Sequence, residues 1–157
     1  MSADDRLAGF LARFAPEIEA RAHALLEHMR KRLPGAVELV YDNYNALVVG
    51  FGPSERASDA PLSIAVYPRW VTLCFLQGAK LSDPERRLAG TGKQVRNVRV
   101  GAPGDLDALD DLIEEAVGNA PAWDSARPRR IVIKSVSPRQ RPRRSQSLKS
   151  PQAPEAR

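Results

Sequence analysis

The chain has 157 residues, of which 43% are hydrophobic and 27% charged, with a single cysteine and a formal net charge of +5. This length indicates one domain with at most an appendage, and the lone Cys74 excludes an internal disulfide framework and a cysteine zinc site. No apolar run approaches the roughly 20 residues of a membrane span, and the acidic first residues lack the layout of a signal peptide, so we expect a soluble cytoplasmic protein.

The N-terminal part predicts two helices. Ser2 and Asp5 have the spacing of a capping box, and an apolar stripe at helical spacing follows over residues 7–14. Pro16 suits the first turn of a second helix. The apolar positions of that helix keep the 3.6-residue period until Pro34-Gly35 ends it.

Three side chains of the second predicted helix, Glu19, His23 and Glu27, follow one another at intervals of four residues. They lie along one line, about 100° from the centre of the apolar face. Carboxylate and imidazole groups in this arrangement are able to ligate Fe²⁺ or Zn²⁺ weakly. The alternative, which we favour, is an ordinary solvated helix face.

The apolar period changes to two after the second helix. Residues 37–41, 47–51, 62–66 and 71–75 are each typical of a half-buried strand, and their short polar connections indicate hairpins. Residues 95–100 are a candidate fifth strand, and a final helix begins at Gly104-Asp105. This order predicts a two-layer α+β fold: an antiparallel meander of four to five strands with the N-terminal and C-terminal helices on one face.

Polar and aromatic residues gather at two of the predicted turns. Strands that alternate in direction place every second connection at the same end of a sheet, so the turns after the first and third strands should share an end. Asn and Asp are ordinary turn residues, but together these side chains are also able to line a polar pocket. The candidate ligand-binding residues of the two turns are Tyr41, Asn43, Tyr44, Asn45, Arg69 and Trp70.

A glycine-containing loop precedes the candidate fifth strand. Gly90 and Gly92 leave backbone amides accessible beside Lys93, which is the arrangement of an anion-binding loop. The loop lacks the first glycine and the final Ser or Thr of the Walker pattern. We expect Gly90, Gly92, Lys93 and Arg96 to fold back and form one anion site with the two turns. The alternative is that the loop is a connection with its lysine in solvent.

The chain divides at about residue 120. Residues 121–157 hold ten Lys or Arg and two acidic residues, a net charge of +8, which leaves −3 for residues 1–120. Only residues 130–136 of this basic, proline-rich tail have strand character, so most of it is expected to be disordered. Its arginines could bind nucleic-acid phosphates in a salt-dependent manner, although the tail lacks aromatic stacking platforms. The composition of the tail is equally compatible with a solubilising extension that binds no nucleic acid.

Three stretches resemble the YdhG-like domain-of-unknown-function family: PGAVELVYDNYNAL, SIAVYPRWVTLCFLQGAKL and LAGTGKQVRNVRV. The resemblance covers about residues 20–118 and implies the same α+β domain. One branch of that family is described as frataxin-like intracellular iron chaperones, but no iron ligand transfers residue by residue. The family pattern corresponds here to Pro34, Glu38, Tyr41, Leu88, Gly90, Gly92 and Lys93.

No catalytic motif is present in the sequence. Cys74 lies within an apolar strand, where free cysteine behaves as a small hydrophobe, and no nucleophile elbow occurs. We therefore expect a non-enzymatic binding domain without a cofactor, a monomer or homodimer whose ligand is a small anion or a protein partner. The alternatives are an iron chaperone, with iron as implied by the resemblance, and a nucleic-acid-associated accessory protein that uses the tail.

Overall fold

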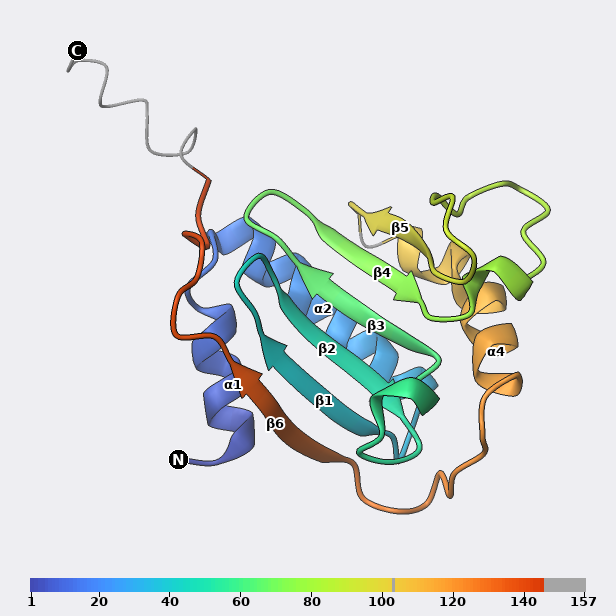
Figure 1. Ribbon diagram of the computed structural model, residues 1–157, viewed down its shortest axis with the longest axis horizontal. Coiled ribbons are helices and arrows are strands. Elements are labelled where there is room, and N and C mark those ends of the chain that lie inside the picture. The colour runs from blue at the N-terminus through green and yellow to red at the C-terminus, as the bar shows by residue number, and fades with distance from the viewer. Residues whose placement is uncertain (103, 146–157) are drawn as a thin grey trace, which may run out of the picture.

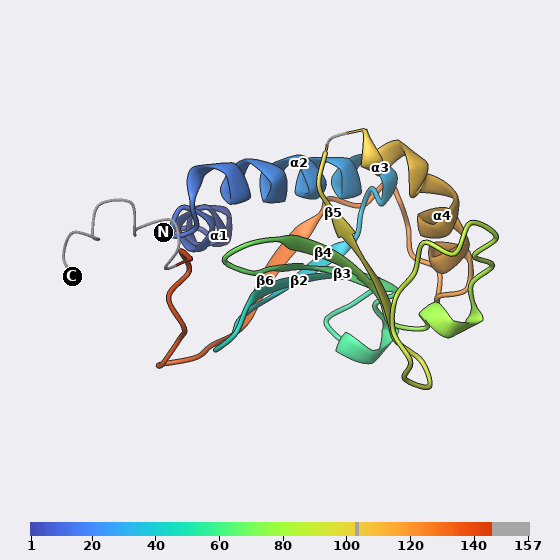
Figure 2. The ribbon, with the colours of Figure 1, turned by 90° about the horizontal axis from the view of Figure 1, so that it is seen from above.

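A computed structural model describes residues 1–102 and 104–145 of the chain. The expected α+β class is confirmed: a six-stranded sheet carries the α-helices on one face (Figures 1 and 2). Among the described residues, no helix is both long and apolar enough to cross a bilayer. The helices are α1 (Ala3–Leu11), α2 (Pro16–Arg32), α3 (Asp105–Ala108) and α4 (Asp110–Gly118), and the strands are β1 (Val37–Asp42), β2 (Leu47–Gly52), β3 (Leu62–Val66), β4 (Val71–Phe75), β5 (Arg96–Val100) and β6 (Arg130–Val136).

The first two helices follow from their local sequence. The capping box of α1 is confirmed, since the backbone N–H of Asp5 donates to Ser2 Oγ over 3.0 Å and the backbone N–H of Ser2 donates to the Asp5 carboxylate. Helix α2 starts at Pro16, where a missing N–H costs nothing. Both helices direct their apolar stripe onto the sheet, and together with the inner face of the strands they form one core.

The sheet has the order β5-β4-β3-β2-β1-β6, and its first five strands form the expected antiparallel meander. The expected four to five strands are fewer than the six observed. Strand β6 lies beside β1 and runs parallel to it, with Val37 opposite Arg130. Ile131 and Ile133 of β6 are partly buried against the core, so this strand covers an edge of β1 that would otherwise remain unpaired.

Residues 121–145 of the tail have defined positions, including residues 130–136, for which the sequence indicated strand character. Residues 146–157 of the tail, also expected to be disordered, lie outside the described residues. Trp123 Nε1 donates to Pro34 O over 3.0 Å, and Arg127 Nε donates to Gly35 O over 2.6 Å. Gly35 has φ +80°, and a Cβ there would lie 2.6 Å from Asp124 O. Specific contacts with the Pro34-Gly35 turn therefore hold the segment that composition alone predicted to be loose.

Residues 137–145, here called the strap, cross the β1–β2 turn after β6 ends (Figure 1). Arg143 of the strap is only 3% exposed, and its Nη2 donates to Asp42 Oδ1 over 2.8 Å and to Asn43 O over 2.6 Å. Its guanidinium also lies 5.6 Å from the Phe14 ring centroid. A buried, paired arginine fixes the position of the strap relative to the turn.

Glu38 of β1 is a second buried carboxylate, only 1% exposed. Arg30 of α2 holds it with two donors, Nε and Nη2, each at 2.9 Å. Burial acts to lower the pKa of Arg30, but the hydrogen bond to Glu38 and the negative charge of that residue outweigh it, so the pKa is raised. The pair joins the second helix to the sheet by a charge-assisted bidentate contact.

Candidate functional site

A cavity of about 590 Å³ lies between the β1–β2 turn, the β3–β4 turn and the strap. We call it the arginine pocket, because three of its lining residues are arginines and none is acidic. The described residues that line it are Asn45, Tyr67, Pro68, Arg69, Trp70, Arg141, Pro142, Arg144 and Ser145.

The antiparallel register places the two turns at the same end of the sheet. Asp42 lies opposite Leu47, and Val66 lies opposite Val71. Each turn is closed by a backbone hydrogen bond, from Asn43 to Ala46 over 3.0 Å in the first and from Tyr67 to Trp70 over 2.9 Å in the second. This is the geometry that brings Asn45 together with Arg69 and Trp70, which belong to the set of residues selected from the sequence.

The arginines of the pocket are positioned by neighbouring polar and aromatic groups. Arg69 Nε donates to Ser145 Oγ over 3.0 Å, and Arg144 Nε donates to Arg13 O over 3.3 Å. The Arg141 guanidinium lies 5.8 Å from the centroid of the Tyr44 ring. Because none of the described lining residues carries a negative charge, their arginines give the pocket a positive potential that favours an anion.

Trp70 forms the aromatic side of the pocket. The Arg99 guanidinium of β5 lies 3.8 Å from its ring centroid, and the Tyr67 ring lies 5.6 Å away at a tilt of 39°. Arg99 reaches this ring because the β4–β5 register places it opposite Thr72, two residues after Trp70. A cation held over an indole face adds positive charge to the rim.

The glycine loop is not part of this pocket. Arg96 lies opposite Phe75, at the end of β4 away from Trp70, a separation of roughly 17 Å at about 3.4 Å per residue. Arg96 Nη1 donates to Gly92 O over 2.7 Å and to Val95 O over 2.9 Å. The single anion site expected from Gly90, Gly92, Lys93 and Arg96 together with the turns is therefore wrong, and Arg96 instead stabilises its own loop.

The other selected turn residues lie near the pocket or away from it. Tyr44 is 47% exposed, and its carbonyl accepts the backbone N–H of Arg141 over 2.9 Å. Asn43 is exposed, with Oδ1 accepting from Ser135 Oγ over 3.4 Å. Tyr41 lies elsewhere, lining a cavity of about 340 Å³ that also includes Cys74. Of these three residues, Tyr44 is the one whose described contacts include a lining residue, Arg141.

Cys74 has the chemistry of a packed thiol. Burial raises its pKa above the ordinary 9.0, and this effect exceeds the lowering by a hydrogen bond with Ser63. A raised pKa leaves little thiolate near neutral pH, and the thiolate is the nucleophilic form. The surroundings of Cys74 thus favour a structural role.

The helical line selected for metal binding does not form one site. His23 Nε2 lies 3.7 Å from Glu19 Oε2, but the Glu27 carboxylate pairs with Arg30 over 3.5 Å. Glu19 and His23 form an (i, i+4) pair on the surface of α2, whereas Glu27 belongs to the ion-pair network of Arg30 and Glu38.

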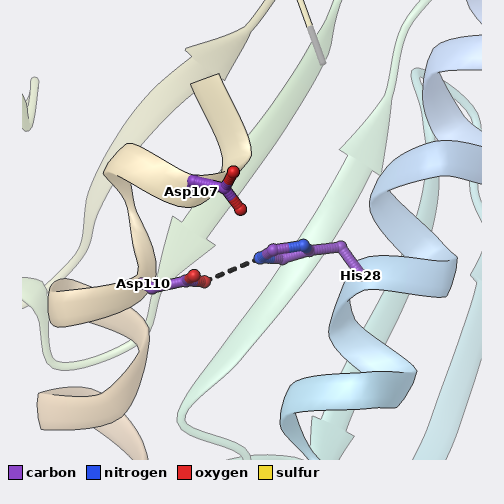
Figure 3. Close-up of side chains that lie close together, drawn as sticks. All are labelled: His28, Asp107 and Asp110. Atoms are coloured by element: carbon purple, nitrogen blue, oxygen red, sulfur yellow. Dashed lines mark hydrogen bonds and ion pairs between the residues drawn. The ribbon is translucent and has the colours of Figure 1, made fainter. Parts of the chain in front are cut away.

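A different cluster of metal-type side chains forms where α2 faces α3 and α4 (Figure 3). The ligand atoms of His28, Asp107 and Asp110 all lie within 4.8 Å of one another, and His28 Nε2 is 2.7 Å from Asp110 Oδ1. Arg32 Nη2 donates to the other oxygen, Asp110 Oδ2, over 2.6 Å. This guanidinium already offsets the charge of Asp110. A contact between α2 and α4 is therefore better supported for the cluster than a cation site.

Several arginines in or beside the pocket could not be predicted from the sequence, because they lie on segments far from the two turns along the chain. Arg141 and Arg144 lie in the tail, whose composition predicts a loose appendage. Arg99, which stacks on the lining residue Trp70, lies on a strand with no motif. The strand character of residues 130–136 was the available signal, because a docked β6 necessarily brings the following arginines to the end of β1. No protein-family model matches the chain, and comparisons with curated proteins and with solved structures also find no match.

Proposed function

We propose that this protein is a non-enzymatic binding domain whose ligand is an anion held in the arginine pocket. The observation that carries the proposal is the convergence of Arg69, Arg141 and Arg144 on one cavity whose described lining includes no acid. The guanidinium group offers paired donors that match phosphate and carboxylate oxygens. An anion is therefore the ligand that this lining fits best.

The pocket also limits the size and shape of the ligand. Its volume of about 590 Å³ is within the range of about 300–1,000 Å³ usual for small-molecule sites. Trp70 and Tyr67 add apolar aromatic surface beside the arginines, and such surface suits a planar ring. A phosphate joined to a ring system, as in a nucleotide, combines both features.

Intrinsic fluorescence tests this proposal, because Trp70 and Trp123 are the only tryptophans. In a Trp123→Phe background, Trp70 alone reports on the pocket, and we expect pyrophosphate and AMP to change its emission with a saturable dependence. Arg141→Ala should weaken binding at least tenfold, which corresponds to about 1.4 kcal/mol. Lys93→Ala, which removes the same charge at the other end of the sheet, is the matched control. Equal losses in both variants, or no saturable signal, would contradict the proposal.

Divalent metal binding is a second candidate, favoured by the cluster of His28, Asp107 and Asp110. The resemblance to the YdhG-like family is the reason to test Fe²⁺, with iron as a cargo. If the cluster binds Fe²⁺, His28→Ala should lower the affinity tenfold or more, while Glu27→Gln should leave it unchanged. Anaerobic titration followed by calorimetry measures this, and an unaltered affinity in His28→Ala would remove the candidate.

A further inference from the structure

We infer that the arginine pocket is the centre of a longer surface that binds single-stranded nucleic acid, an inference that rests on the proposed anion-binding function. Exposed arginines extend beyond the pocket on both sides, at the end of α1 and on β5. We call this set the arginine track: Arg13, Arg141, Arg144, Arg69 and Arg99.

Hydrogen bonds join the strap to the segments on either side of it across the end of the sheet. Arg144 Nε donates to Arg13 O over 3.3 Å, which joins the strap to the end of α1. Arg69 of the β3–β4 turn donates to Ser145 of the strap over 3.0 Å. From β1 to β5 the sheet spans four inter-strand steps, or roughly 19 Å at about 4.8 Å per step, which is longer than a single phosphate group and suits several nucleotides.

The carboxylate of Asp42, which lies beneath the track, is already paired with two arginines. Asp42 is buried beneath the strap, where Arg143 holds it at 2.8 Å and Arg13 lies at 3.6 Å. Among residues 1–102 and 104–145, no carboxylate pairs with Arg99, Arg141 or Arg144 within 4.0 Å. A positive surface of this kind attracts the phosphate backbone without regard to sequence.

Aromatic rings lie beside two arginines of the track, Arg141 and Arg99, and this favours a single strand over a duplex. Tyr44 is 47% exposed beside Arg141, and Trp70 lies under Arg99. Unpaired bases stack on aromatic side chains, a contact worth about 1–3 kcal/mol per base, and a positive groove follows their backbone. The bases of a duplex are already stacked on one another, so Tyr44 would have nothing to bind.

The test uses the full chain and fluorescein-labelled oligothymidylates of four and twelve nucleotides, measured by anisotropy between 50 and 200 mM NaCl. We expect the longer oligonucleotide to bind more tightly than AMP. The logarithm of its affinity should fall with the logarithm of salt concentration at a slope of about −3 for four neutralised phosphates. Tyr44→Ala should weaken oligonucleotide binding at least fivefold and leave pyrophosphate binding unchanged, whereas Arg141→Ala should weaken both. Lys93→Ala is the charge-matched control, and circular dichroism checks that each variant is folded.

The outcomes separate this inference from the function on which it rests. If pyrophosphate and AMP bind but the oligonucleotide binds no more tightly than AMP, the track is wrong and the pocket stands. If a 12-base-pair duplex or phosphatidylserine vesicles compete as well as the single strand, the specificity inferred from Tyr44 is wrong. If neither small anion binds, the proposed function fails, and oligonucleotide binding that is insensitive to Arg141→Ala would overturn the inference as well.

Discussion

Arg143 is the residue through which the strap is joined to the sheet. Its pair with Asp42 has both side chains almost fully buried, and removal of one partner from a buried ion pair typically costs about 3–5 kcal/mol. We therefore expect Arg143→Met to lower the free energy of unfolding by about 3 kcal/mol in urea denaturation. The neighbouring Arg13, at 3.6 Å from Asp42, compensates only in part because its side chain is half exposed.

Two further variants distinguish the buried charge from lost packing. In the double variant Asp42→Asn/Arg143→Met, the buried carboxylate that would lack a partner is also removed. The double variant should therefore recover part of the lost free energy of unfolding. Arg141→Met, at an exposed position in the same strap, should change stability by less than about 0.5 kcal/mol. A loss below about 1 kcal/mol in Arg143→Met would mean that the strap depends little on this pair.

Cys74 gives a second prediction at the scale of one side chain. Because burial raises the pKa of its thiol above 9.0, the folded protein should react with iodoacetamide more slowly at pH 7.5 than the same chain in urea. The rate should continue to increase as the pH is raised past 9.0, since the thiolate fraction is still rising there. Mass spectrometry gives the labelled fraction. A rate that levels off below pH 9.0 would show that the thiol is activated.

The sequence allowed some of the pocket residues to be predicted and concealed others. Strand alternation is a local rule, and it was enough to place Asn45 near Arg69 and Trp70. The positions of Arg141 and Arg144 depend on the buried contact between Arg143 and Asp42, two residues about 100 positions apart. No local pattern marks such a pair, because an arginine that is to be buried is identical in sequence to one in solvent.

At the scale of an element, β6 decides whether the body of the protein is independent of its tail. A division of the chain at about residue 120 would require residues 1–120 to fold alone, but β6 is hydrogen-bonded to β1 and carries Ile131 and Ile133 onto the core. We expect a chain that ends at residue 129 to melt more than about 5 °C lower than the full chain, a loss above roughly 1 kcal/mol. A chain that ends at residue 145 keeps β6 and the strap and is the control. If differential scanning calorimetry gave the same melting temperature for the chain that ends at residue 129 and for the full chain, β6 would not be needed for the stability of the body.

The contact between α2 and α4 gives a prediction about a pair of elements. Asp110 accepts hydrogen bonds from His28 and Arg32 of α2, at 2.7 and 2.6 Å. Asp110→Asn should lower stability by about 0.5–1 kcal/mol, and the loss should shrink at 1 M NaCl because these groups are partly exposed. Asp111→Asn, at the exposed neighbouring position, should have little effect. A salt-independent loss in urea denaturation would argue against an ionic contact.

Element identity was predictable wherever a periodic pattern was long. The two N-terminal helices and the five meander strands follow from apolar spacing and turn residues. The sixth strand was ambiguous because RIVIKSV is short and lies among prolines and arginines. Its docking depends on a free edge of β1 and on Gly35, whose left-handed backbone leaves room for the returning chain.

At the scale of the whole molecule, the basic and acidic parts of the sequence lie together in one fold, and the basic residues gather at one end of the sheet. Residues 130–145 of the basic tail do not remain apart from the acidic body, because β6 and the strap bring their arginines against the turns of the sheet. The net charge of +5 for the whole chain therefore understates the positive charge gathered at the arginine track. The fold class was predictable without this contact, but the candidate site was not.

The parallel pairing of β6 with β1 also has a consequence for how the protein is made. Residue 130 pairs with residue 37, so the partner of the first strand leaves the ribosome about 90 residues after it. At roughly 5–20 residues per second, the emerging chain carries an unprotected strand edge for several seconds or more. During translation this edge is a site for intermolecular strand addition. Cells that produce the protein quickly should therefore need chaperones that bind the chain until β6 has been synthesised.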